Sequence, residues 1–164
     1  DADPDVRCVV VTGAGGNFMA GGDVKFFHAE IERLRASAGD GLGELFAAAH
    51  GAIRGIRTSG KPFVASAAGA VAGFGVSLLA ACDLAIAAAD ARFSLAYLGI
   101  GASPDGGSTW TLPRLVGLRR ALELALLNER VDAATAAAMG LVNRVVPTQD
   151  LEAQTLALAR VQCQ

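Results

Sequence analysis

The chain has 164 residues, of which 52% are hydrophobic and 18% are charged, a composition that excludes a disordered chain and suffices for one packed core. The formal net charge of −2 and the pI near 5.6 argue against a nucleic-acid-binding protein, which normally carries a basic stripe. Because aromatic residues make up only 5% of the chain, the core is expected to pack through small side chains.

The cysteines and histidines form no recognisable disulfide framework or metal site. The cysteines are odd in number, widely spaced and flanked by apolar residues, which indicates reduced thiols in a cytoplasmic protein. Neither histidine lies in a metal-ligand pattern, so no metal site is expected. The residues concerned are Cys8, Cys82, Cys163, His28 and His50. The longest apolar run, residues 63–81, is broken by glycines and predicts a strand, a loop and a helix rather than a membrane span.

Strands and helices are expected to alternate along the chain. Residues 6–12 form a nearly continuous β-branched run, typical of a strand buried on both faces. Further strands are expected at 63–68, 83–88, 92–94 and 143–146. Helices are expected at 23–35, 40–57, 76–81 and 118–127, then from a cap at Asp132 to just before Gly140, and finally after a cap at Thr148. This alternation predicts an α/β fold with mostly parallel strands.

One domain is expected over residues 1–164, because no internal repeat or low-complexity linker divides the chain. The sequence enters its first predicted strand almost at once and stops partway through a predicted helix. We therefore expect a fragment of a longer protein.

Two glycine-rich loops follow predicted strands and can bring main-chain amides close to a ligand. In the first loop, Gly21 and Gly22 directly precede a predicted helix, whose N-terminus presents unpaired N–H groups to a negative charge. The alternative is an ordinary turn with Asp23 as the helix N-cap. The second loop, residues 69–75, places Phe74 between two glycines. Its spacing fits neither a dinucleotide fingerprint nor a phosphate loop, so by itself it indicates close helix–strand packing.

Several motifs occur in order between residues 6 and 152. They read VVVTG at 9–13, FMAGGDV at 18–24, KP at 61–62, AAGAVAGFG at 67–75, CD at 82–83, ARF at 91–93, LPRLVG at 112–117 and AAAMGLVNRVVP at 136–147. Together they resemble the enoyl-CoA hydratase/isomerase (crotonase) superfamily. The resemblance implies a crotonase-like (ClpP/crotonase) spiral of ββα units, from which this chain lacks the first unit and the C-terminal helical region.

The resemblance also gives the two loops a role in binding an acyl-CoA. The amides of Gly22 and Phe74 would form an oxyanion hole around the thioester carbonyl. A thioester α-proton leaves at neutral pH only if preorganised donors meet the enolate oxygen, and each donor contributes about 2.7–4 kcal/mol. Lys25 would pair with a CoA phosphate, with a solvated helix lysine as an equal alternative. Ala20, Gly22, Asp23 and Val24 would line the nucleotide part of CoA, and Gly73 and Ser77 would contact the substrate.

The superfamily's hydratases use two glutamates, and the resemblance puts Ser77 and Tyr97 at those positions. Neither is a carboxylate base, so hydration by paired glutamates is not expected. The remaining carboxylate is Asp105, in a Pro-Asp-Gly sequence that by itself is a turn signal. Isomerases of the superfamily, including those of phenylacetate breakdown, carry a catalytic aspartate here, and so does its 4-chlorobenzoyl-CoA dehalogenase. We therefore expect Asp105 to act as general base and then as general acid.

Three further side chains have more than one interpretation, and a fourth departs from the family's pattern. Tyr97 and Trp110 would hydrogen-bond to the acyl group or wall its pocket, or would pack in the core. His50 matches the catalytic histidine of the dehalogenase, although a hydrogen-bonded structural histidine on an apolar helix face is favoured. Phe74 replaces the family's usual glycine, so its ring must be accommodated in or near the pocket.

Three functions are therefore considered. The first is an enoyl-CoA isomerase of fatty acid metabolism that shifts a double bond with Asp105. The second is a thioester hydrolase or dehalogenase-like enzyme with Asp105 as nucleophile and His50 as base. The third, prompted by the missing glutamates, is a catalytically silent acyl-CoA binder or oligomeric scaffold. In each case CoA belongs to the substrate and no separate cofactor, nucleic acid or membrane is expected. The resemblance implies a homo-oligomer, a trimer or hexamer.

Overall fold

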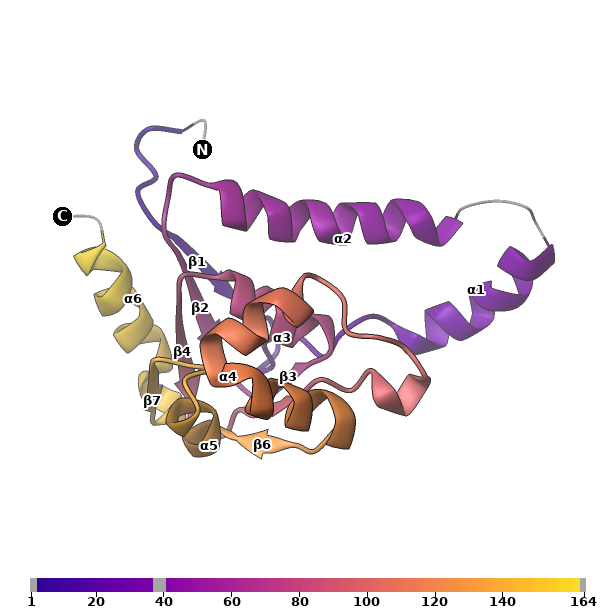
Figure 1. Ribbon diagram of the computed structural model, residues 1–164. Helices are drawn as coiled ribbons and strands as arrows, with labels where there is room; N and C mark the ends of the chain where they lie inside the picture. The colour runs from indigo at the N-terminus through magenta and orange to yellow at the C-terminus, as the bar shows by residue number, and fades with distance from the viewer. Residues whose placement is uncertain (1–2, 37–40, 163–164) are drawn as a thin grey trace.

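A parallel sheet of four strands carries the loops of interest. The computed structural model of the chain describes residues 3–36 and 41–162, and within them this sheet has the order β1-β2-β4-β7 (Figure 1). β2 and β4 lie in the middle and are buried along almost their whole length, as their continuous apolar runs predict. The strands are β1 (Val9–Thr12), β2 (Phe63–Ala67), β4 (Leu84–Ala88) and β7 (Arg144–Val146).

A second sheet of three short strands is only partly predictable from the sequence. It has the order β3-β5-β6, with β3 (Ala70–Ala72), β5 (Arg92–Ser94) and β6 (Val131–Asp132). The sequence predicts β5 but assigns all of residues 69–75 to a loop. That assignment is wrong, because β3 pairs in parallel with β5. β6 is also missing from the prediction, since two residues are too few to give an alternating pattern.

The predicted helices lie at the right places along the chain, but their lengths are predicted less well. In the described residues they are α1 (Val24–Ala36), α2 (Gly41–Thr58), α3 (Phe74–Ala81), α4 (Ser108–Leu127), α5 (Ala133–Ala138) and α6 (Leu151–Val161), with the 3₁₀ turns η1 (Leu98–Ile100) and η2 (Thr148–Asp150). α4 begins well before the expected residue 118 and is interrupted at Gly117, whose φ of 78° and ψ of 155° are not helical. Within the described ranges, no helix is both long and apolar enough to cross a membrane.

Of the two predicted helix caps, one is confirmed. The carboxylate of Asp132 accepts a hydrogen bond from the Thr135 amide at 2.7 Å and caps α5. Thr148 does not cap the last helix, because residues from Thr148 onward first form η2 and α6 starts at Leu151. Cys163 lies outside the described residues.

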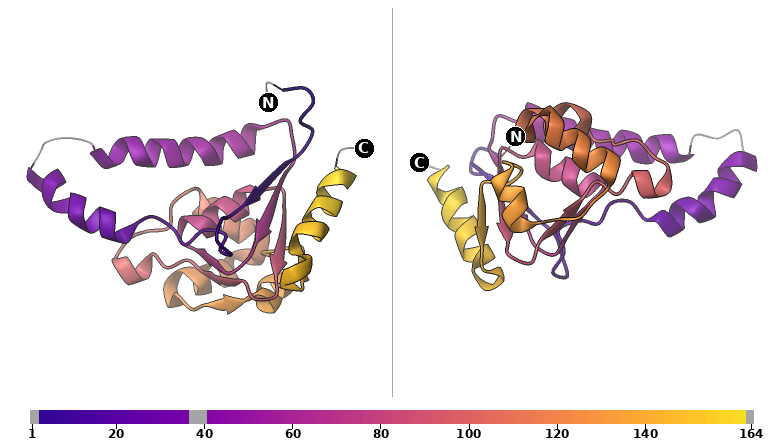
Figure 2. Two further views of the ribbon diagram at one scale, coloured as in Figure 1. Left: turned by 180° about the vertical axis from the view of Figure 1, so that it is seen from behind. Right: turned by 60° about the horizontal axis from the view of Figure 1, so that its bottom comes forward.

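The helices take two different places relative to the sheets. α1 and α2 form an arm that extends beyond both sheets, and Figures 1 and 2 show the same arrangement from three sides. α2 returns over α3, which packs against α4, and α6 covers β1, β2 and β4. Buried side chains between these layers are mostly alanine, valine and leucine, with Phe93 the largest that is fully buried. Packing through small side chains agrees with the low aromatic content.

A buried hydroxyl pair joins α6 to the sheet and makes the first testable prediction. Ser66 Oγ lies 2.9 Å from Thr155 Oγ1, which itself donates to the Leu151 carbonyl oxygen at 2.7 Å. Replacing Thr155 with Val is expected to lower the free energy of unfolding by about 1–3 kcal/mol, because the Ser66 hydroxyl stays buried without its partner. Urea denaturation measures the loss. As a control, adding Ser66→Ala to this variant removes the orphaned hydroxyl and should restore part of the lost free energy of unfolding. A further decrease in that free energy would contradict this explanation.

Candidate active site

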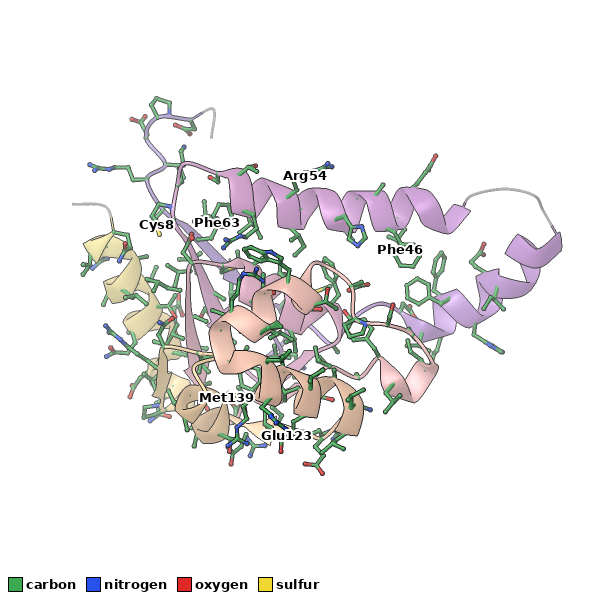
Figure 3. All side chains as sticks on the ribbon, viewed as in Figure 1. Cys8, Phe46, Arg54, Phe63, Glu123 and Met139 are labelled. Atoms are coloured by element: carbon green, nitrogen blue, oxygen red, sulfur yellow. The ribbon has the colours of Figure 1, made fainter. Side chains whose placement is uncertain are left out.

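A largely apolar cleft of about 870 Å³ lies between the arm and the loops that precede α1, α3 and α4. Its outer wall includes the rings of Phe27 on α1 and Phe46 on α2, which stack with centroids 6.4 Å apart. In Figure 3 the labelled Phe46 extends from α2 toward α1. The cleft is lined by Met19, Ala20, Gly21, Gly22, Val24, Phe27, Leu45, Phe46, Ala48, Ala49, His50, Gly73, Phe74, Leu95, Ala96, Tyr97, Ile100, Ala102, Ser103 and Asp105.

Main-chain hydrogen bonds hold the two glycine loops against each other. The Met19 amide donates to the Ala70 carbonyl oxygen at 3.0 Å, and the Ala72 amide donates to the Met19 carbonyl oxygen at 2.8 Å. Gly21 follows with a left-handed φ of 95°, and a Cβ atom placed on it would lie 3.8 Å from the Phe74 nitrogen. The two loops, separate in sequence, therefore meet at one end of the cleft.

The amides of Gly22 and Phe74 are available for a ligand at this meeting point. Within the described part of the chain, neither N–H group donates a hydrogen bond. For Phe74 the reason is its position as the first residue of α3, because the first amides of a helix have no partner inside it. The neighbouring Gly73 amide, in contrast, donates to the Ser94 carbonyl oxygen at 3.0 Å. These two amides, on adjacent segments of main chain, can therefore both donate hydrogen bonds to one negatively charged oxygen.

Asp105 reaches the same cleft from the loop before α4, and its main chain is firmly held. Its carbonyl oxygen accepts hydrogen bonds from Ser77 Oγ at 2.9 Å, from the Ser108 amide at 3.0 Å and from Ser108 Oγ at 2.8 Å. Ser77 and Ser108 are fully buried, so these bonds are shielded from water. The arrangement fixes the loop and with it the carboxylate.

The side chain of Asp105 is held as well, by Tyr97. The Tyr97 hydroxyl donates to Asp105 Oδ1, and it also lies 3.4 Å from Ser77 Oγ. Burial, followed by the hydrogen bond to Asp105, raises the pKa of Tyr97 to about 12. Tyr97 is therefore a protonated donor at neutral pH. In the described residues, no group of three His, Cys, Asp or Glu side chains could hold a metal ion.

Comparison with known proteins identifies the family to which these loops belong. A family model described as enoyl-CoA hydratase/isomerase matches residues 1–162. The chain belongs to the enoyl-CoA hydratase/isomerase family. This membership confirms the resemblance that the motifs indicate.

Individual family members agree in sequence and in fold. The chain is 38% identical over 148 residues to a protein of Rhodobacter capsulatus described as a probable enoyl-CoA hydratase, covering 90% of this chain and 55% of that protein. It is 32% identical over 160 residues to the 1,2-epoxyphenylacetyl-CoA isomerase of Escherichia coli, covering 98% and 60%. A crystal structure of an enoyl-CoA hydratase from Polaromonas sp. JS666 matches with a TM-score of 0.89 and 37% identity over 98% of this chain and 61% of that one. The crotonase-like fold is thereby confirmed, and the chain spans little more than half the length of these relatives.

Most residues that the sequence singles out come together in this one cleft. Those that line it are Ala20, Gly22, Val24, His50, Gly73, Phe74, Tyr97 and Asp105. Asp23 and Lys25 are not among the residues that line the cleft. The Asp23 carboxylate instead caps α1, accepting hydrogen bonds from the amides of Lys25 and Phe26, each at 3.0 Å. Ser77 is fully buried behind the cleft and touches it only through Asp105 and Tyr97. The structure therefore combines the N-cap interpretation of Asp23 with an open amide at Gly22.

Trp110 does not join the other predicted residues. It is 52% exposed on α4 and is not among the residues that line the cleft. Its ring is instead covered by the guanidinium of Arg114, 3.9 Å from the centroid, with that of Arg57 at 5.9 Å. The expectation that Trp110 walls the acyl pocket is corrected accordingly, and so is the alternative that it packs in the core.

His50 also differs from the favoured expectation. It is an exposed residue on α2 that lines the cleft, and within the described residues its side chain makes no hydrogen bond. The expectation that His50 is a hydrogen-bonded structural histidine is therefore wrong. The helical spacing that marked this face of α2 as apolar is real, but Leu45, Phe46 and Ala49 on it line the cleft while Ile53 is buried in the body. Sequence spacing alone cannot separate a face that covers a core from one that walls a cavity.

The ring of Phe74 is accommodated by Gly106, which leads to a second prediction. A Cβ atom on Gly106 would lie 2.7 Å from Ser77 Cβ and 2.9 Å from Phe74 Cε2, and its φ of 56° is left-handed. Gly106→Ala is expected to lower the free energy of unfolding by about 2–4 kcal/mol, since overpacking adds to the backbone strain. Gly107 is the matched control, because its φ of 74° is also left-handed but no atom lies within 4 Å of its Cβ position. Equal losses in both variants, measured by urea denaturation, would show that packing against Phe74 is unimportant.

Tyr97 gives a third prediction, because it is the only tyrosine in the chain. The ultraviolet absorbance of tyrosinate should therefore titrate with a midpoint near pH 12 rather than at the ordinary value of 10.0. Since the pKa is raised in the folded state, this group's contribution to stability is complete below pH 10 and is lost as the pH rises from about 10 to about 12. Circular dichroism at each pH verifies that the protein is still folded. A midpoint near 10 in folded protein would contradict the burial and the hydrogen bond described here.

Proposed function

We propose that this protein is an enoyl-CoA isomerase, which moves a double bond along the acyl chain of a CoA thioester with Asp105 as its single acid and base. The observation that carries the proposal is the combination of two unpaired amides, of Gly22 and Phe74, with one carboxylate on a largely apolar cleft. Family membership supports acyl-CoA as the substrate class.

The two amides would stabilise the charge that develops during the reaction. When a proton leaves the acyl chain, negative charge moves onto the thioester oxygen, and preorganised N–H donors there are each worth about 2.7–4 kcal/mol. These donors belong to main chain held by the Met19 hydrogen bonds, so they need no rearrangement as the charge forms. An acyl chain bound on the mostly apolar lining would displace water and so strengthen both interactions.

Asp105 would perform both proton transfers. Its carboxylate removes a proton from one carbon of the acyl chain, giving a dienolate held by Gly22 and Phe74, and the carboxylic acid so formed returns the proton two carbons away. The double bond shifts, no water is added, and the enzyme ends as it began. Among the described residues that line the cleft, Asp105 is the one carboxylate. A single carboxylate suits a proton shift better than a hydration that uses a pair.

A second function, thioester hydrolysis or a dehalogenase-like reaction, is favoured by one observation. His50 lines the same cleft as Asp105, so a nucleophilic carboxylate and a base for water are both present. We rank it second because the proton shift needs Asp105 alone, whereas hydrolysis needs Asp105 and His50 to act together. Assembly into trimers or hexamers and a cytoplasmic location stay predictions.

Asp105→Asn provides the fourth prediction and the test of the proposed function. In deuterium oxide, incorporation of deuterium into the acyl chain across a small panel of saturated and unsaturated acyl-CoA thioesters should fall by roughly 10²–10⁴-fold, because the only acid and base is lost. Glu123→Gln is the control, since Glu123 is an exposed carboxylate on α4 away from the cleft (Figure 3).

The other outcomes distinguish the three functions. Unchanged deuterium incorporation in Asp105→Asn would overturn the assignment and favour a silent binder. Release of free CoA or halide by the unaltered protein, abolished by both Asp105→Asn and His50→Gln, would establish the second function instead. Under the proposed isomerase mechanism, His50→Gln should retain double-bond migration.

A further inference from the structure

Tyr97 and Asp105 form a contact that the proton transfer by itself does not require. A general base needs one oxygen near the substrate, yet the Tyr97 hydroxyl donates to Oδ1 of the same carboxylate. Within the described residues, Oδ2 has no hydrogen-bond partner. The two oxygens of Asp105 are therefore in different situations, one held by protein and one available to a ligand in the cleft.

Tyr97 is itself held by burial and by hydrogen bonds to its main chain. The residue is only 8% exposed. Its carbonyl oxygen accepts hydrogen bonds from the amides of Ile100 at 3.1 Å and Ala102 at 3.0 Å, which tie it to the loop that continues to Asp105. The preceding residue, Ala96, has a left-handed φ of 58°, a conformation that non-glycine residues adopt at a cost. This turn directs the chain from the end of β5 into the cleft.

Ser77 links the tyrosine and the aspartate to α3. Its hydroxyl donates to the Asp105 carbonyl oxygen at 2.9 Å and lies 3.4 Å from the Tyr97 oxygen. It is fully buried on the helix whose first amide belongs to Phe74. The carboxylate and one of the two unpaired amides are therefore connected to each other through Ser77 and α3.

We infer that Tyr97 is a positioning residue, which holds Oδ1 of Asp105 so that Oδ2 meets the acyl chain at a fixed distance from the Gly22 and Phe74 amides. The inference rests on the proposed function. A role for Tyr97 as the acid or base itself is opposed by its pKa of about 12, which keeps the hydroxyl protonated at neutral pH.

The decisive variant is Tyr97→Phe, which keeps the ring and deletes the hydroxyl. We expect the kcat for proton exchange to fall by roughly 10–100-fold, because a loosely held base loses alignment, while KM stays within about twofold. Leu98→Ala is the control, because Leu98 is exposed on the adjacent η1 turn and does not line the cleft. An unchanged kcat in folded Tyr97→Phe, or a loss that appears in KM alone, would overturn the inference.

A second measurement separates this inference from the proposed function. In Asp105→Asn, the tyrosinate midpoint should fall below about 12 but stay above 10.0, because burial still raises the pKa of Tyr97 while the carboxylate no longer does. If Asp105→Asn abolishes exchange while Tyr97→Phe leaves kcat unchanged, only the positioning role fails. If Asp105→Asn leaves exchange intact, the proposed function fails and the positioning role with it, whatever the tyrosinate midpoint does. An unchanged midpoint in Asp105→Asn would by itself exclude the coupling on which the positioning role depends.

Discussion

Hydrogen bonds between Met19 and β3 are the contact on which the candidate site depends. Met19 donates to Ala70 and accepts from Ala72, so the loop before α1 continues the parallel pairing of β3. The spacing between the Gly22 and Phe74 amides is thus set by main chain, not by side chains. Phe74 can stand where the resemblance puts a glycine, because its N–H group stays unpaired and Gly106 leaves room for its ring.

The polar groups behind the cleft form one connected set centred on Asp105. Resemblance to the superfamily puts Ser77 and Tyr97 where hydratases have glutamates, and both residues contact Asp105. At these two positions, hydroxyl groups that donate hydrogen bonds to Asp105 stand in place of carboxylates. Buried polar groups are tolerated only when they are satisfied, and Ser77, Ser108 and Tyr97 all have partners here. The loss of two glutamates is therefore compatible with a site rebuilt around one carboxylate.

Prediction from the sequence succeeds where a local pattern has one structural meaning. The β-branched run before Gly13, the apolar strands β2 and β4 and the Asp132 cap follow from period, composition and capping chemistry. The family motifs identify the two glycine loops and Asp105. Predictions fail where tertiary contacts determine the local structure. β3 is a strand only because it pairs with β5 and Met19, and the Trp110 ring lies against the guanidinium of Arg114 instead of lining the cleft. The hydrogen bond between Tyr97 and Asp105 likewise depends on a left-handed Ala96 that no sequence pattern announces.

The arm formed by α1 and α2 divides the cleft between two parts of the molecule. The amides and the carboxylate belong to loops tied to the sheets and α3, whereas much of the apolar wall comes from Phe27, Leu45 and Phe46 on helices that extend beyond them (Figure 1). Exchanging one apolar side chain for another on this wall alters the shape of the cleft without moving the amides or the carboxylate. The wall can thus change in sequence independently of these polar groups, with one helix face acting as an interchangeable lining.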